Sequence, residues 1–199
     1  IGPKWDNVPM LWSNYNGTLI RTIIILKGIE SKFAANYVVY DKACDLDENK
    51  VTQSYYSYTS IDGKKGFKAT YWNNRERSGN IVTTTQIENP LKLTVAGDHE
   101  FASGVKLVEF SGKYETEFTA PETEEIAFKY GSTGSFELFV NDKSIARSFN
   151  WRTLPSKASY KVEKAKKYKI QIRYAQLNNW QANLEFDCGK VMDIDFSSL

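Results

Sequence analysis

The sequence predicts a mainly β protein: an antiparallel β-sandwich, with a partial βαβ piece of an α/β sandwich at its N-terminus. Three observations support this prediction. From Phe67 onward, apolar and polar residues alternate with a period of two, and clusters of turn residues separate the alternating runs. The first 60 residues differ, because they combine helical spacing with an apolar run that does not alternate.

The alternating runs place the sandwich at about residues 65–189, with about nine strands. We expect strands at Phe67–Tyr71, Ile81–Ile87, Leu91–Val95, Glu115–Phe118, Ile126–Phe128, Phe136–Val140, Tyr160–Val162, Tyr168–Tyr174 and Ala182–Phe186. Glycine, proline, asparagine and serine mark the turns between them, at Ser78–Asn80, Ala120–Thr123, Gly131–Gly134 and Asn141–Lys143.

The N-terminal segment, residues 1–60, reads as most of a βαβ unit. Apolar residues keep helical spacing over Thr22–Phe33, although the β-branched run Ile23–Ile25 would also suit a strand. Tyr37–Tyr40 is apolar without alternation, which is typical of a parallel strand covered on both faces. The chain opens with Ile1, followed at once by Gly2 and Pro3, so we expect it to start inside a domain, after a missing strand.

Composition and charge exclude several classes of function. Lys and Arg number 26 against 24 Asp and Glu, so the net charge of +2 gives no footprint for nucleic acid. The longest apolar run, Ile23–Leu26, is far too short to cross a membrane, and no signal-peptide pattern opens the chain.

No residues combine into a catalytic site. His99 is the only histidine, and no serine or cysteine nucleophile motif accompanies it. Glu122, Glu124 and Glu125 cluster at a predicted turn, where carboxylates usually keep an edge solvated. We therefore predict no catalytic residue, metal or cofactor in this chain.

Five segments, in order, resemble the protective-antigen-type (PA) domain, a β-sandwich often inserted in glycosidases and adhesins. They are Gly66–Asn74, Phe110–Gly112, Ala120–Thr123, Leu138–Lys143, and Lys167–Ile170 with Ala182–Phe186. The resemblance implies a sandwich at residues 65–189 that contacts carbohydrate.

The first segment resembles the start of the second, α/β domain of glycoside hydrolase family 3. Ile1–Pro3, Leu11–Thr18, Leu26–Ile29 and Ala43–Asp45 show this similarity. Members include β-glucosidases and β-xylosidases, and some carry the PA-type module inserted in that domain. The resemblance implies that residues 190–199 return into the α/β domain and that the parent enzyme is exported, to the periplasm or outside the cell. It also implies that the catalytic nucleophile and general acid lie outside this chain.

Sugar rings bind flat aromatic side chains flanked by amides or guanidinium groups. Two connections offer that mixture: Trp151 with Arg152, and Asn179 with Trp180. The alternative, that both tryptophans seal the end of the sandwich, stays open. Trp72 is predicted to be core.

Two further candidates depend on the α/β segment. Trp12 and Tyr15 follow a predicted parallel strand, at the edge where α/β folds bind ligands. By resemblance, that edge faces the family's active-site pocket.

The resemblance also bears on calcium and on the two cysteines. Adhesin members bind sugar through calcium held by adjacent aspartates, but the matching stretch here is Ser132–Gly134, without a carboxylate, so we predict no calcium. Cys44 and Cys188 flank the predicted insertion. Buried reduced thiols are the commoner state for isolated cysteines, but a disulfide between them stays open.

The function predicted first is a non-catalytic accessory module of a β-glycosidase, acting on β-linked glucosides or xylosides together with the missing catalytic domains. Its loops would shape substrate access and specificity. The alternative is a structural spacer or dimerisation domain, forming a homodimer with no sugar contact. An independent hydrolase is disfavoured, since no nucleophile or acid/base pair is present.

Overall fold

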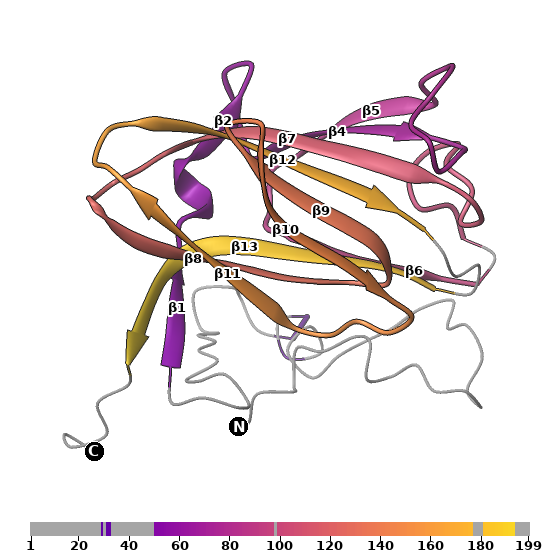
Figure 1. The fold of residues 1–199 in the computed structure, drawn as a ribbon. Helices are drawn as coiled ribbons and strands as arrows, with labels where there is room; N and C mark the ends of the chain where they lie inside the picture. Colours follow the sequence, from indigo (N-terminus) through magenta and orange to yellow (C-terminus); the bar gives the residue numbers. More distant parts are fainter. Residues whose placement is uncertain (1–28, 30, 33–49, 98, 177–180, 194–199) are drawn as a thin grey trace. The chain divides into compact units, whose positions relative to one another are not determined.

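Two stacked β-sheets form the fold in the computed structural model, which describes residues 29, 31–32, 50–97, 99–176 and 181–193 (Figure 1). The chain divides into two compact units, one made of residues 53–190 and the other of residues 1–52 with 191–199. The first unit contains nearly all of the described residues, including the core and every aromatic contact between the two sheets.

The larger sheet has eight strands. Six follow the order β10 (Lys143–Asn150), β9 (Gly134–Val140), β12 (Lys167–Ala175), β7 (Ser111–Thr119), β2 (Thr59–Ile61) and β3 (Lys64–Lys65). The strand β4 (Phe67–Trp72) pairs with both β7 and β5 (Thr83–Ile87). Every one of these neighbouring pairs is antiparallel.

The smaller sheet has five strands. Its order is β1 (Lys50–Ser54), β13 (Gln181–Asp193), β8 (Glu124–Ser132) and β11 (Ser156–Val162), and β6 (Leu91–Ala96) also pairs with β13. A short 3-10 helix, η3 (Tyr56–Tyr58), connects β1 to β2. No helix in the described part of the chain has the length and apolarity that a membrane crossing requires.

Aromatic contacts between the sheets fill the core. Tyr130 of β8 stacks on Phe136 of β9 with ring centroids 4.6 Å apart, and Phe67 of β4 meets Phe186 of β13 edge-on at 5.9 Å. Burying one side chain of this size stabilises a fold by about 1.5–3 kcal/mol. The inward residues of β9 and β12 are fully buried because alternation turns every second side chain inward: Phe136, Leu138, Val140, Ile170, Ile172 and Tyr174.

The predicted antiparallel β-sandwich is therefore confirmed. The sheets also contain strands that were not predicted from the sequence. β1, β2 and β3 all begin before residue 65, where we expected the sandwich to begin, and β10 fills Lys143–Asn150. β10 has only half-buried and exposed residues and an irregular register between Ser144 and Ala146, so its alternation is weak.

The predicted turn at Gly131–Gly134 is a tight corner rather than a loop. Ser132 ends β8 in one sheet and Gly134 begins β9 in the other, with only Thr133 between them. Thr133 donates its N–H to Asn183 O, and Asn183 N–H donates to Thr133 Oγ1, both at 3.0 Å. These bonds fix the point at which the chain changes sheets.

Several predictions lie outside the described residues. They are the strand at Tyr37–Tyr40 and nearly all of the helix at Thr22–Phe33, together with Trp12, Tyr15, Cys44, Asn179, Trp180 and residues 194–199. The proposed division into residues 1–60, 65–189 and 190–199 stays a prediction.

Candidate functional site

Among the described residues, the most exposed aromatic side chains lie at the end of β10 and on the connection from β10 to β11. Trp151 is 68% exposed and Phe149, near the end of β10, is 63% exposed. Leu154 is 56% exposed, and Arg152, which follows Trp151 in the sequence, is also exposed. Such exposure excludes the alternative in which Trp151 seals the end of the sandwich. We call Phe149, Trp151, Arg152 and Leu154 the aromatic edge.

A buried asparagine anchors this connection to the smaller sheet. Asn183 of β13 is 3% exposed, and its Nδ2 donates to Thr153 Oγ1 at 2.6 Å. Thr94 Oγ1 of β6 donates to Asn183 Oδ1 at 3.0 Å. Gly131 makes room for the connection, because a Cβ there would lie 2.9 Å from Thr153 Cγ2. The aromatic edge is thus presented by a fixed backbone rather than by a free loop, which favours binding.

The stretch Ser132–Gly134 is enclosed in the sandwich. Ser132 is 1% and Thr133 4% exposed. Thr133 Oγ1 accepts from Asn183 N–H and lies 3.5 Å from Tyr174 OH, so it is already in use. Among the described residues, no three His, Cys, Asp or Glu side chains gather where they could hold a metal ion. The prediction of no calcium stays a prediction.

The glutamates at the turn between β7 and β8 form structural contacts. Tyr55 OH donates to Glu124 Oε1 at 2.6 Å, and burial, followed by this bond, raises the pKa of Tyr55. Lys190 Nζ lies 3.4 Å from Glu124 and 3.6 Å from Glu122. Glu125 and His99 are exposed elsewhere. This arrangement ties β8 to β13 and to the segment after β1, and it gives no pair of carboxyl groups facing a cleft.

Trp72 is buried, as predicted, but not in the central core. It is 8% exposed, and alternation along β4 turns Phe67, Ala69 and Tyr71 inward, which places Trp72 on the outer face of the larger sheet. The connection from β4 to β5 folds back there, since Ser111 Oγ donates to Asn74 O at 2.6 Å. Trp72 therefore has a packing role beneath this connection.

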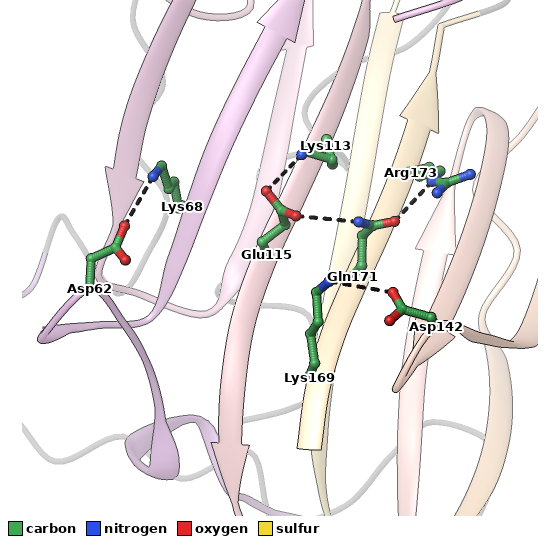
Figure 2. A network of polar contacts seen from close by, with 8 residues as sticks. All are labelled: Asp62, Lys68, Lys113, Glu115, Asp142, Lys169, Gln171 and Arg173. Carbon is green, nitrogen blue, oxygen red and sulfur yellow. Dashed lines mark hydrogen bonds and ion pairs between the residues drawn. The ribbon is translucent and has the colours of Figure 1, made fainter. Parts of the chain in front are cut away.

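The same outer face carries a chain of polar contacts that was not predicted from the sequence (Figure 2). Lys113 Nζ lies 2.9 Å from Glu115, Gln171 Nε2 donates to Glu115 Oε1 at 3.3 Å, and Arg173 Nε donates to Gln171 Oε1 at 2.9 Å. The guanidinium carbon of Arg173 lies 4.5 Å from the centre of the Phe139 ring. Lys113 with Glu115, and Gln171 with Arg173, are neighbours on one face of their own strands, but only the pairing of β7 with β12 joins the two pairs.

Phe149 was also missed, although a signal was present. Phe149 and Trp151 are two residues apart, which places two aromatics on one face of an extended segment. Asn150–Arg152 was predicted as a loop, and no strand was predicted to lead into it. Trp151 and Arg152 are both exposed, and their pairing at a sugar site stays a prediction, whereas the second predicted pair, Asn179 and Trp180, lies outside the described residues.

Comparison with known proteins identifies the fold. The family model of the PA14 domain matches residues 63–195. The chain is 40% identical over 198 residues to a xylan 1,4-beta-xylosidase of Xylanibacter ruminicola, covering 98% of this chain but only 23% of that protein.

Two solved structures share the architecture at low sequence identity. A beta-glucosidase from Kluyveromyces marxianus superposes with a TM-score of 0.55 at 13% identity, over 90% of this chain and 23% of that one. An anti-sigma factor domain-containing protein from Clostridium clariflavum gives 0.54 at 17% identity, over 65% and 43%. At such identities the likeness shows the fold alone. From the family match and the sandwich together, the chain belongs to the PA14 domain family.

Proposed function

We propose that this chain is the accessory, non-catalytic PA14 module of a β-glycosidase that acts on β-linked xylosides or glucosides. The identity of 40% to a xylosidase over nearly the whole chain supports this parent, together with the resemblance of residues 1–60 to glycoside hydrolase family 3. The module spans less than a quarter of that relative, so the reaction itself is assigned to other parts of the parent.

The observation that carries the proposal is the anchored aromatic edge. Trp151 offers a large exposed ring, Arg152 is an exposed residue next to it in the sequence, and the bond from Asn183 to Thr153 fixes the backbone between β10 and β11. Rings of this kind stack on the apolar faces of sugars, while guanidinium groups donate to hydroxyl oxygens. The edge therefore supplies binding energy to the part of an oligosaccharide that lies beyond the bond being cleaved.

The spacer alternative calls for an apolar patch away from this connection. Among the described residues, the two large apolar side chains with the greatest exposure are Trp151 and Phe149, both on the aromatic edge. The observations thus favour carbohydrate contact, and dimerisation through the same edge is the competing use to be tested.

Kinetics on oligosaccharides of increasing length test the proposal. In the full-length enzyme, Trp151→Ala should lower kcat/KM about threefold to tenfold on the longer substrates, since an aromatic contact contributes about 0.5–1.5 kcal/mol. An aryl glycoside, which is too short to reach the edge, should be cleaved at the original rate. Ile81→Ala is the matched control, because Ile81 is 55% exposed on a different connection.

Unchanged kinetics on every substrate length would remove the aromatic edge from the proposal. A fall in kcat/KM that is equal on short and long substrates would instead indicate damage to the enzyme. Sedimentation of the wild type and of Trp151→Ala tests the alternative: a dimer that dissociates on this substitution, with kinetics intact, would assign the edge to self-association.

A further inference from the structure

An exposed ring and an ion pair are neighbours at one edge of the larger sheet. The strand register places Phe149 of β10 opposite Ser135 of β9, and Arg147 opposite Glu137. Every second residue of β9 is buried, and Ser135 and Glu137 are the residues in between, so both belong to the outer face. Residues opposite each other share a face, so Phe149 and Arg147 belong to the outer face as well.

The ring of Phe149 is open to a ligand. It is one of the two most exposed large apolar side chains among the described residues. Its partner across the strands is Ser135, which is too small to cover an aromatic ring. β10 is the first strand in the order of the larger sheet, so no described strand of this sheet lies on its other side.

The ion pair lies one alternation along β10 from this ring. Arg147 Nε lies 3.1 Å from Glu137 Oε1. Arg147 and Phe149 are two residues apart on one face of the strand, a separation of about 7 Å. Within the described part of the chain, the second carboxylate oxygen of Glu137 and the terminal amino groups of Arg147 have no further hydrogen bond or ion pair. Hydrogen-bonding capacity therefore remains on both sides of the pair.

The next arginine along the sheet is engaged elsewhere. Arg173 of β12 stands opposite Glu137 in the strand register. Its Nε instead donates to Gln171 Oε1 at 2.9 Å, and its guanidinium carbon lies 4.5 Å from the centre of the Phe139 ring (Figure 2). The ion pair of Glu137 is the one with Arg147.

We propose that Glu137 and Arg147 bind the hydroxyl groups of a neutral sugar residue whose ring stacks on Phe149. The proposal rests on the proposed carbohydrate contact at the aromatic edge. It deepens that contact by naming the residues that recognise the sugar and the substrate class, which is a β-linked chain of neutral sugars with free hydroxyl groups.

The chemistry of the pair favours a neutral ligand with hydroxyl groups. A hydroxyl both donates and accepts, so it can donate to the carboxylate of Glu137 and accept from the guanidinium of Arg147. A charged ligand would have to compete with one member of the pair for the other. The apolar face of the same sugar packs on Phe149, as sugars do on aromatic rings. The strand register and the ion pair hold all three side chains near one another before the ligand arrives.

Calorimetric titration of the 199-residue chain tests this site. The probes are a linear xylo-oligosaccharide and the same oligosaccharide with methylated hydroxyl groups. We expect the unmodified probe to bind about tenfold more tightly, because methylation removes the donors to Glu137 and leaves a carboxylate without a partner. Glu137→Gln should reduce this preference to about threefold or less, since a neutral amide is the weaker acceptor. Phe149→Ala and Arg147→Gln should each weaken binding of both probes, because the ring face and the ether oxygens survive methylation.

Glu117→Gln is the matched control. Glu117 of β7 forms an ion pair with Lys167 on the outer face of the same sheet, also at 3.1 Å, but on strands that do not include β10. This variant should keep the tenfold preference of the unsubstituted chain.

The outcomes separate this site from the aromatic edge as a whole. An equal loss of preference in Glu117→Gln would overturn the site. Unchanged binding in Glu137→Gln and Phe149→Ala, with a loss in Trp151→Ala, would also overturn the site but leave carbohydrate contact at the aromatic edge in place. If the unsubstituted chain bound neither probe, the carbohydrate contact at the edge would be overturned, and this site with it.

Discussion

At the scale of single residues, Gly66 shows how one position joins several strands. It has a φ of +89°, and a Cβ there would collide with Ile87 O and with Tyr56 OH. Its own backbone is bound on both sides, since its N–H donates to Thr59 O at 3.0 Å and Thr116 Oγ1 donates to its carbonyl at 2.7 Å. Neither the conformation nor the space allows a side chain.

Gly66→Ala should therefore lower the free energy of unfolding by more than about 3 kcal/mol, because left-handed strain and a clash with backbone add. Gly63→Ala is the control. Gly63 has a φ of +75° but nothing within 4 Å of its added Cβ, so strain alone should lower stability by about 1–2 kcal/mol. Urea unfolding measures both values, and equal losses would show that the clash at Gly66 is relieved by a small shift.

At the scale of elements, hydrogen bonds join β13 of the smaller sheet to the segment that leads from β1 to the larger sheet. Ser54 Oγ donates to Asp187 Oδ1 at 2.7 Å, Cys188 N–H donates to the same oxygen at 2.8 Å, and Tyr55 N–H donates to Cys188 O at 2.7 Å. Gly189 allows β1 to approach, since a Cβ there would meet Gln53 O. Burial raises the pKa of Asp187 despite these two donors and the nearby Lys129.

The raised pKa of Asp187 determines the direction in which stability changes with pH. Because the folded pKa of Asp187 lies above the ordinary value of 3.8, the folded state binds the proton more tightly, so stability falls as pH rises from about 3.8 through the folded pKa. Asp187→Asn keeps an oxygen for both donors and removes the charge. Its free energy of unfolding at pH 7 should be equal to or about 1 kcal/mol above that of the wild type, with a flatter dependence on pH over that window.

Ser54→Ala should make stability depend more steeply on pH. The Ser54 hydroxyl lowers the pKa of Asp187, so its loss raises that pKa further. Chemical denaturation at a series of pH values should show a steeper fall in stability for Ser54→Ala. A wild-type stability that rises with pH over the window, and is unchanged in slope by either substitution, would contradict this account.

At the scale of the whole molecule, the reactivity of the Cys188 thiol measures whether the sandwich is folded. Its side chain is 1% exposed within the hydrophobic core, and burial, followed by the charge of Asp187, raises the pKa of its thiol. A thiol with a raised pKa and no access to solvent reacts only when the surrounding structure opens. The structure describes Cys188 as a free thiol.

In Cys44→Ser, a thiol reagent should label Cys188 in native buffer only at the slow rate set by global unfolding, and promptly once urea unfolds the chain. Fast labelling in native buffer would mean that β13 opens locally. In the unsubstituted chain, counting thiols under denaturing conditions decides between two reduced cysteines and a bond between Cys44 and Cys188.

The fold was predictable wherever one face of a strand is fully buried. Runs such as Phe136–Val140 and Tyr168–Tyr174 alternate clearly because every second side chain enters the core. β10 lies at the edge of its sheet with no fully buried residue, and β2 and β3 are three and two residues long, so their patterns are too weak or too short to read. At the candidate site, Trp151 and Arg152 could be proposed from the sequence because they are neighbours in it.

By itself, the sequence determined that two antiparallel sheets enclose one aromatic core, since the period of two is a local property that each strand carries in its own residues. It also determined the family through the order of its segments. Only the tertiary structure decided which polar residues meet, because the pairing register that aligns Arg173 with Lys113 is set by contacts between distant segments. Local alternation fixes which face a side chain occupies, whereas its neighbours on that face depend on how the strands pair.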